Sequence, residues 1–439
     1  MRKYCLLVLI LSFVYSCTTE QKTVDLYVDV NVNVNASGDG SMDNPFTTIS
    51  NALTKAKEIK STSLNTHVNV NLLEGEYYLD KPIMIDSSLS GLSIIGAHPA
   101  KVILKGSRKL VAQWQKFNEN IYVTQVPQNL SFDQLIIGDE PQILARYPNY
   151  DENGGYWQGH AADAIGKEKV AMWKNPIGAY FHVLHNGRWG GFHYKIIGLN
   201  EDGTPKLEGG HQNNRPSRPH EEYRMVENVF EELDAPGEWF LDKANAKLYY
   251  YPTTKINLEN AKVEVSTLKS LIQVIGTTKN PVKNVTISNI GLQHTERTFM
   301  KKYEPLLRSD WTIYRGGVVF FEGTENCTIT NSILKDLGGN AILASKYNAD
   351  LRITENHIYD CGGSAISFIG DPSAVRSPAF QYGEIVPYSE MDTLPGPKNE
   401  LYPRNSLVEN NLIHRIGRTE KQTAGVQIAM AMDITIRSN

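Results

Sequence analysis

Two carboxylates stand close together in a loop-rich stretch near the C-terminal end of the sequence. Asp371 and Glu384 bound the segment "DPSAVRSPAFQYGE", and Arg376 lies between them. Two carboxylates that face each other across a glycosidic bond can hydrolyse it, at about 5.5 Å apart for retention and further apart for inversion. We therefore take Asp371 and Glu384 as candidate catalytic residues and Arg376 as a candidate substrate contact. Asp371 can equally begin a turn before Pro372, and Glu384 can equally be a solvated loop residue.

Other polar side chains could contact a carbohydrate. Asn213 and Arg215 lie in the polar stretch "HQNNRPSRPHEEYR", and His294 and Glu296 lie in "LQHTER". Side chains of these types can bind sugar hydroxyls, although an ordinary exposed loop explains the first stretch equally well.

Three histidines cluster in "FHVLHNGRWGGFHYK", where a metal site could be suspected. Their spacing lacks a metal-binding signature such as HExxH. We therefore predict an aromatic β-surface for His182, His185 and His193. No metal and no redox cofactor is expected.

A repeat must position these residues. "NCTITNSILKDLGGNAI" from Asn326 aligns without a gap with "DLRITENHIYDCGGSAI" from Asp350, so Ile353 follows Ile329 by 24 residues (353 − 329). A fixed period of 20–50 residues is typical of stacked repeat proteins. Further copies begin at Asn284 and Leu407, and insertions separate them from the aligned pair.

Each copy contains short runs of alternating apolar residues, separated by Asp and Gly-Gly. Such runs predict short strands joined by tight turns. Twenty-four residues suffice for about three strands and three turns, stacked about 4.8 Å apart on the next copy. The sequence therefore predicts an all-β fold, a right-handed parallel β-helix, in which Ile329 stacks on Ile353 and Ile342 stacks on Ile366.

Three asparagines near the turns, Asn331, Asn356 and Asn411, are expected to hydrogen-bond between coils. Asp336 and Asp360 recur in register before Gly-Gly, so we assign them to stabilising the turns.

The two insertions predict a groove. One falls at about 296–315 and the other at about 370–404, so both flank the same face of the coils. If Ile342 and Ile366 point inward, then Leu343, Ser367 and Gln427 point outward into that groove. Ser367 and Gln427 are therefore further candidate substrate contacts.

The N-terminal residues "MRKYCLLVLILSFVYSC" combine a basic start with an apolar run too short to span a membrane. They resemble a bacterial lipoprotein signal, which implies cleavage before Cys17 and its lipidation. A plain secretory signal is the alternative. Of the other cysteines in the mature chain, Cys327 and Cys361 occupy different columns of the repeat, so we expect buried thiols rather than a disulfide.

Four regions follow along the chain. Residues 1–17 form the signal, and 24–106 form the N-terminal cap and first coils. Residues 107–268, where the repeat disappears, form an inserted β-rich domain, and 269–439 form the later coils. The cap is expected to include a helix that begins at Asn44 and Pro45 and shares one face among Phe46, Ile49, Leu53 and Ala56.

Three motifs of the middle region, "LARYPN", "ENVFEELDAPGEWFLD" and "KLYYYP", accompany the cap sequence "SGDGSMDNPFTTISNA" and the repeats. Together they resemble β-helical, pectin-lyase-like carbohydrate-active lipoproteins of the Bacteroidetes type, similar to glycoside hydrolase family 141. The resemblance implies a monomeric glycoside hydrolase, lipid-anchored at the outer membrane, that acts on a plant or host glycan.

Two other functions stay open, because β-helices carry several chemistries. A polysaccharide lyase acting on a uronate-containing glycan would often use Ca²⁺, and a surface protein could bind glycans without cleaving them. A net charge of −4, from 44 basic and 48 acidic residues, does not favour a nucleic-acid partner.

The chain ends within a predicted coil, since Asn439 is in register with Asn356 and Asn411. We expect further coils beyond Asn439 in a longer protein, where additional catalytic acids could lie.

Overall fold

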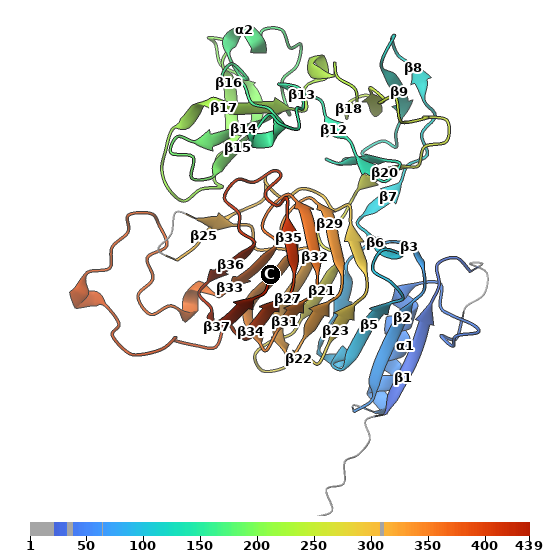
Figure 1. Ribbon diagram of the computed structural model, residues 1–439. Coiled ribbons are helices and arrows are strands. Elements are labelled where there is room, and N and C mark those ends of the chain that lie inside the picture. Colours follow the sequence, from blue (N-terminus) through green and yellow to red (C-terminus); the bar gives the residue numbers. More distant parts are fainter. Residues whose placement is uncertain (1–21, 33–37, 64, 308–310) are drawn as a thin grey trace, which may run out of the picture.

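The computed structural model describes residues 22–32, 38–63, 65–307 and 311–439, and these residues form an almost entirely β structure (Figure 1). The predicted signal and Cys17 lie outside them. No helix among the described residues is both long and apolar enough to cross a membrane.

Most strands stack in three parallel columns, as expected for a curled parallel sheet of the β-helix kind. The first column consists of β1 (Thr23–Val28), β2 (His67–Leu72), β5 (Leu92–Gly96), β23 (Thr286–Ser288), β28 (Thr328–Thr330), β31 (Arg352–Thr354), β34 (Pro403–Glu409) and β37 (Met432–Arg437). The second consists of β4 (Ile83–Ile85), β21 (Ile272–Ile275), β27 (Val319–Glu325), β30 (Ile342–Ala349), β33 (Ile366–Ile369) and β36 (Val426–Ala429). The third consists of β3 (Gly75–Tyr78), β6 (Val102–Lys105), β24 (Gly291–Gln293), β29 (Ile333–Leu337), β32 (His357–Cys361) and β35 (Leu412–His414).

The register of these columns follows the 24-residue repeat. Ile329 pairs with Ile353, and Ile342 pairs with Ile366. All four side chains are fully buried in one continuous apolar core. The predicted stacking of these residues is therefore confirmed, because alternation along each short strand turns every second side chain inward.

Asparagine ladders join successive coils, as predicted. Asn331 donates to Asn289 at 2.6 Å, and Asn356 donates to Asn411 at 3.0 Å. Asn356 and Asn411 both donate and accept along the stack. Cys327 and Cys361 are free and buried, which confirms the expectation for both thiols.

The predicted helix exists, but it begins later than expected. Helix α1 (Ile49–Thr62) is capped by the Thr48 side chain, which accepts from the backbone amide of Asn51. Asn44 and Pro45 precede it, because Phe46 forms a β-bridge with Val28 instead of a helical turn. Ile49 and other apolar residues of α1 pack into the core beside β1 and β2.

Between β6 and β21 the chain builds a separate group of mostly antiparallel sheets, drawn in cyan to yellow-green in Figure 1. We call residues 107–266 the inserted domain. It comprises β7 (Ser107–Lys109), β8 (Gln115–Lys116), β9 (Tyr122–Gln125), β10 (Leu135–Ile137), β11 (Glu140–Pro141), β12 (Ile143–Leu144), β13 (Arg146–Tyr147), α2 (Lys167–Val170), β14 (Tyr180–His185), β15 (Gly191–Leu199), β16 (Pro205–Gly209), β17 (Pro219–Glu227), β18 (Glu238–Asp242), β19 (Lys247–Tyr250) and β20 (Val263–Ser266). Its entering and leaving strands, β7 and β20, pair with each other.

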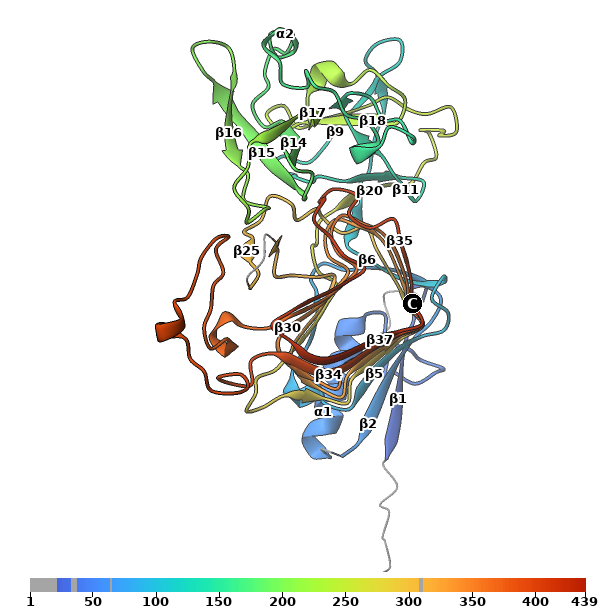
Figure 2. The same cartoon turned by 60° about the vertical axis from the view of Figure 1, so that its left-hand side comes forward.

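The inserted domain faces the third column of the coils. In both Figure 1 and Figure 2 it lies over the edge of the stack near β35, whereas the long loop between β33 and β34 extends from another side. The turns after the third column are therefore the part of the stack that can form a site together with the inserted domain.

Candidate functional site

A hollow of about 340 Å³ lies between the turns of the third column and the inserted domain. We call it the acidic hollow, after the three carboxylates that line it. The coils contribute Asp336, Leu337, Gly338, Asp360, Gly362, Arg415, Arg418 and Thr419, the inserted domain contributes Gln134, Pro141, Tyr150, Glu152 and Gln158, and Arg297 completes the lining.

Asp336 and Asp360 occupy equivalent positions in neighbouring coils. Their flanking residues pair directly, Lys335 with Tyr359 and Leu337 with Cys361. Equivalent positions of neighbouring parallel strands lie about 4.8 Å apart. Both aspartates adopt positive φ angles, 53° and 51°, which Asp tolerates better than most residues. The sequence therefore places two carboxylates one above the other at the wall of the hollow.

Each aspartate is held by basic side chains. Arg415 donates to Asp360, and Arg418 approaches it at 3.8 Å. Lys335 lies 3.2 Å from Asp336. Within the described residues, neither carboxylate accepts a backbone hydrogen bond, so the predicted turn-stabilising role is supported by the backbone conformation and not by a side-chain hydrogen bond to the turn. The positive φ angles still suit Asp to these turns.

Arg297 is fixed from the inserted domain. Its guanidinium donates to Glu227 at 2.6 Å, and Asp133 lies 3.4 Å from its Nε. Burial opposes ionisation, but the two carboxylates hold the pKa of Arg297 above its ordinary value. The side chain is only 12% exposed, so this cation is immobilised at the boundary of the site.

The histidine cluster supports that arrangement from behind. His182 and His193 pair across β14 and β15, with 2.6 Å between their Nδ1 atoms, and His182 Nε2 lies 3.1 Å from Glu227. Burial lowers the pKa of both imidazoles, which favours their neutral forms. His185 is also buried. The predicted aromatic β-surface is thus an internal one.

A second hollow, of about 180 Å³, adjoins the first at Arg297. We call it the basic hollow, because its charged lining consists of Lys243, Lys269, Arg297 and Lys301 with Asp133 and Glu296. Glu296 is ion-paired with Lys269 at 2.7 Å. Burial raises the pKa of Asp133, against the opposing effect of Arg297.

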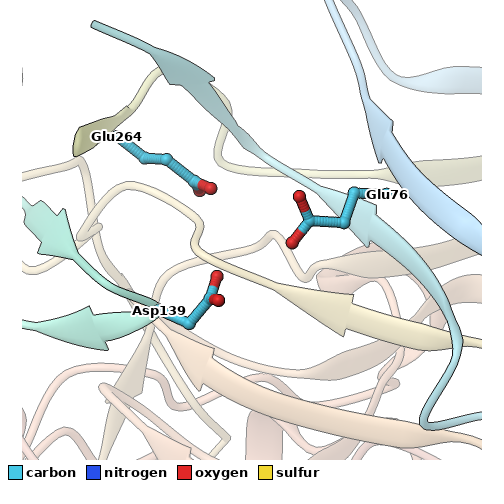
Figure 3. Close-up of side chains that lie close together, drawn as sticks. All are labelled: Glu76, Asp139 and Glu264. Carbon is cyan, nitrogen blue, oxygen red and sulfur yellow. The ribbon is translucent and has the colours of Figure 1, made fainter. Parts of the chain in front are cut away.

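A third acidic group lies where the inserted domain joins the coils, a junction that we call the neck. Glu76, Asp139 and Glu264 point toward one another in Figure 3, at distances that could suit a metal ion. The ammonium of Lys105 lies 2.7 Å from Glu76 and 2.9 Å from each of the other two. Lys262 lies 2.7 Å from both Glu76 and Asp139, so two protein cations already pair with these carboxylates.

The predicted pair Asp371 and Glu384 is engaged within its own loop. Asp371 caps the short helix η4 (Pro372–Ala374) by accepting from Ser373. Glu384 accepts from the backbone amides of Phe380 and Gln381. Arg376 donates to Asp392 and to two carbonyls of the same loop.

The predicted groove is covered where Ser367 and Gln427 lie. Both residues point away from the core as expected, yet both are buried. Trp311 and Leu306 of the insertion between β24 and β27 pack over the neighbouring Leu343 and Ile369. The expectation of an open floor is wrong here, because the first insertion folds back on the strands instead of standing beside them.

The other predicted substrate contacts lie in different parts of the structure. Glu296 lines the basic hollow. His294 is buried and faces Glu264 at 3.2 Å, so it belongs to the neck rather than to a surface that could contact a substrate. Asn213 donates to the carbonyl of Trp189, and the Arg215 guanidinium stacks 3.6 Å from the ring of Trp189.

No protein-family model and no curated protein matches the sequence. Among solved structures, a protein described as a glycoside hydrolase superimposes with a TM-score of 0.74 at 18% identity, over 94% of this chain and 77% of its own. The Pseudomonas phage phi297 tailspike gp61 gives a TM-score of 0.14 at 9% identity, over 90% of this chain and 52% of its own. The first comparison shows a shared fold.

Proposed function

We propose that the protein hydrolyses glycosidic bonds of a polysaccharide or oligosaccharide in the acidic hollow. The observation that carries the proposal is the stacking of Asp336 and Asp360 in neighbouring coils at one wall of that hollow. A spacing of about 4.8 Å between strands is close to the 5–5.5 Å between the carboxyl groups of retaining glycosidases. The likeness in fold to a glycoside hydrolase supports the same reaction class.

The two aspartates would divide the chemistry. Asp360, which is ion-paired with Arg415 and lies 3.8 Å from Arg418, attacks the anomeric carbon and forms a glycosyl ester as the leaving oxygen departs. Asp336 gives its proton to that oxygen. It then takes a proton from the water that hydrolyses the ester, so the acid is regenerated. Glu152, which the inserted domain contributes to the lining, would contact the sugar.

We do not extend this role to Asp371 and Glu384. Their carboxylates already accept hydrogen bonds from backbone amides of their own loop. They remain useful controls, since Asp371→Asn alters a carboxylate outside the acidic hollow.

A polysaccharide lyase is the second candidate, favoured by three arginines in the lining, Arg297, Arg415 and Arg418. Lyases that act on uronates use basic side chains to bind the acid group and to remove the adjacent proton. That reaction leaves an unsaturated product that absorbs ultraviolet light, which hydrolysis does not.

We further infer the cellular context from the N-terminal sequence. Cleavage before Cys17 and lipidation there would anchor a monomeric, right-handed β-helical enzyme at the bacterial outer membrane. Helix α1 would cover the first coil as a cap. We expect no cofactor for hydrolysis.

The test uses a panel of plant and host glycans with wild type, Asp336→Asn, Asp360→Asn and Asp371→Asn. Hydrolysis should release reducing ends without ultraviolet absorbance. Either substitution in the acidic hollow should lower the rate at least about 100-fold, while Asp371→Asn retains activity. Unsaturated products would establish the lyase, and tight binding without any cleavage would establish a binding protein.

A further inference from the structure

We propose that the basic hollow is a subsite for a negatively charged sugar unit that carries a carboxylate or a sulfate, an inference that rests on the function proposed above. It would hold the unit of the glycan that adjoins the bond placed between Asp336 and Asp360. The substrate would then be an acidic glycan rather than a neutral one.

The charges of the hollow favour an anion. Of its two carboxylates, Glu296 is paired with Lys269, and Asp133 faces Arg297. Among the described residues, no carboxylate lies within 4.0 Å of the ammonium of Lys243 or Lys301. Two exposed lysines thus stand at the hollow without an ion-pair partner, although Lys243 donates to the hydroxyl of Ser131 at 2.9 Å, and an anionic ligand could pair with both.

Arg297 supplies the second observation. Its Nη1 donates to Glu227. Its Nη2 is buried without a hydrogen-bond partner, and Nε makes none either, although Asp133 lies 3.4 Å from it. A buried guanidinium with an unused donor is costly unless a ligand or water completes it. Guanidinium groups bind carboxylates and sulfate-like anions through such forks.

Size and position fit a single sugar unit. The volume of about 180 Å³ is smaller than the roughly 300–1,000 Å³ of pockets for drug-sized ligands. Tyr180 and Phe299 offer ring surfaces in the lining. Arg297 lines both hollows, and the consecutive residues Asp133 and Gln134 line one each. The two hollows can therefore hold neighbouring units of one chain.

The experiment measures binding of methyl β-glucuronide, a methyl glucoside 6-sulfate and methyl β-glucoside by calorimetry at low salt. At least one charged glycoside should bind more tightly than the neutral glycoside, and the one that binds identifies the acid group. The double variant Lys243→Gln/Lys301→Gln should weaken that binding about 2- to 30-fold, since each of two exposed charge pairs contributes about 0.2–1 kcal/mol. Lys279→Gln, an exposed lysine outside both hollows, is the matched control.

Equal binding of the neutral glycoside would overturn the proposal, as would an unchanged affinity in the double variant or no binding of either charged glycoside. Asp360→Asn separates this proposal from the proposed hydrolysis, because it should abolish cleavage and leave lysine-dependent binding in place. If wild type binds the charged glycoside through the lysines but cleaves no glycan, then the subsite stands and the proposed hydrolysis fails.

Discussion

Replacing Lys105 by Met should destabilise the protein by about 3–5 kcal/mol at neutral pH, because it removes one partner from a buried ionic network. The Lys105 side chain is 1% exposed, and its ammonium lies within 2.9 Å of three carboxylates. Glu264 would lose this cation although its own side chain is fully buried. The ammonium of Lys262 would remain 3.4 Å from Glu264, but the Lys262 side chain is 28% exposed.

The effect should depend on pH in a defined direction. Burial opposes ionisation of Glu264, but hydrogen bonds from His294, Ser107, Tyr78 and Lys105 hold its pKa below the ordinary value. A carboxyl group whose pKa is lower in the folded state stabilises the fold at pH values above its unfolded pKa, about 4.3. That stabilisation is lost as the pH falls. The free energy of unfolding of Lys105→Met should therefore approach that of wild type in acid. The difference should shrink by up to about 1.4 kcal/mol per pH unit below about pH 4.3.

Urea denaturation followed by circular dichroism measures both effects. Lys101→Met is the matched control, since the ion pair of Lys101 with Glu74 is 59% and 57% exposed and should contribute at most about 1 kcal/mol. If Lys105→Met cost no more than Lys101→Met, the neck network would not stabilise the fold as argued.

Three further outcomes are expected. Ile353→Ala should cost about 2–5 kcal/mol in urea denaturation, because the side chain is fully buried between coils, and a loss under about 1 kcal/mol would contradict that packing. Cys17→Ser should move the protein from the membrane fraction to the soluble fraction, and unchanged fractionation would exclude a lipid anchor at this residue. Burial raises the pKa of Glu420 to about 7, so stability should fall as the pH rises from about 4.3 to 7, and Glu420→Gln should remove that loss. If the free energy of unfolding of Glu420→Gln depended on pH as that of wild type does, the raised pKa of Glu420 would be refuted.

The stacked coils could be predicted because their information is local and repeated. Ile329 and Ile353 lie in aligned copies, and strand alternation decides which face of each strand is buried. Whether the outward face of the strands is exposed or covered could not be predicted in the same way. Whether Ser367 is open or covered depends on how Trp311 and Leu306 fold back, and no periodic pattern encodes that contact.

The candidate site shows the same limit. Asp336 and Asp360 were visible in register, but a turn and a catalytic pair share the same sequence signature. The residues that the inserted domain brings to these turns, Glu152 among them, distinguish a lined hollow from an ordinary turn. Arg297 was missed as well, because its partners Glu227 and Asp133 are distant in sequence.

The most direct test of the central claim is to trap the sugar on the enzyme. A panel of 2-deoxy-2-fluoro glycosyl fluorides supplies a good leaving group, and the fluorine slows turnover of the covalent intermediate that retaining hydrolysis requires. Peptide mass spectrometry should then find the label on Asp360, and Asp360→Asn should take up none. A label on Asp371 or Glu384, or hydrolysis that proceeds with inversion and leaves no label, would contradict the stacked aspartates as the catalytic pair.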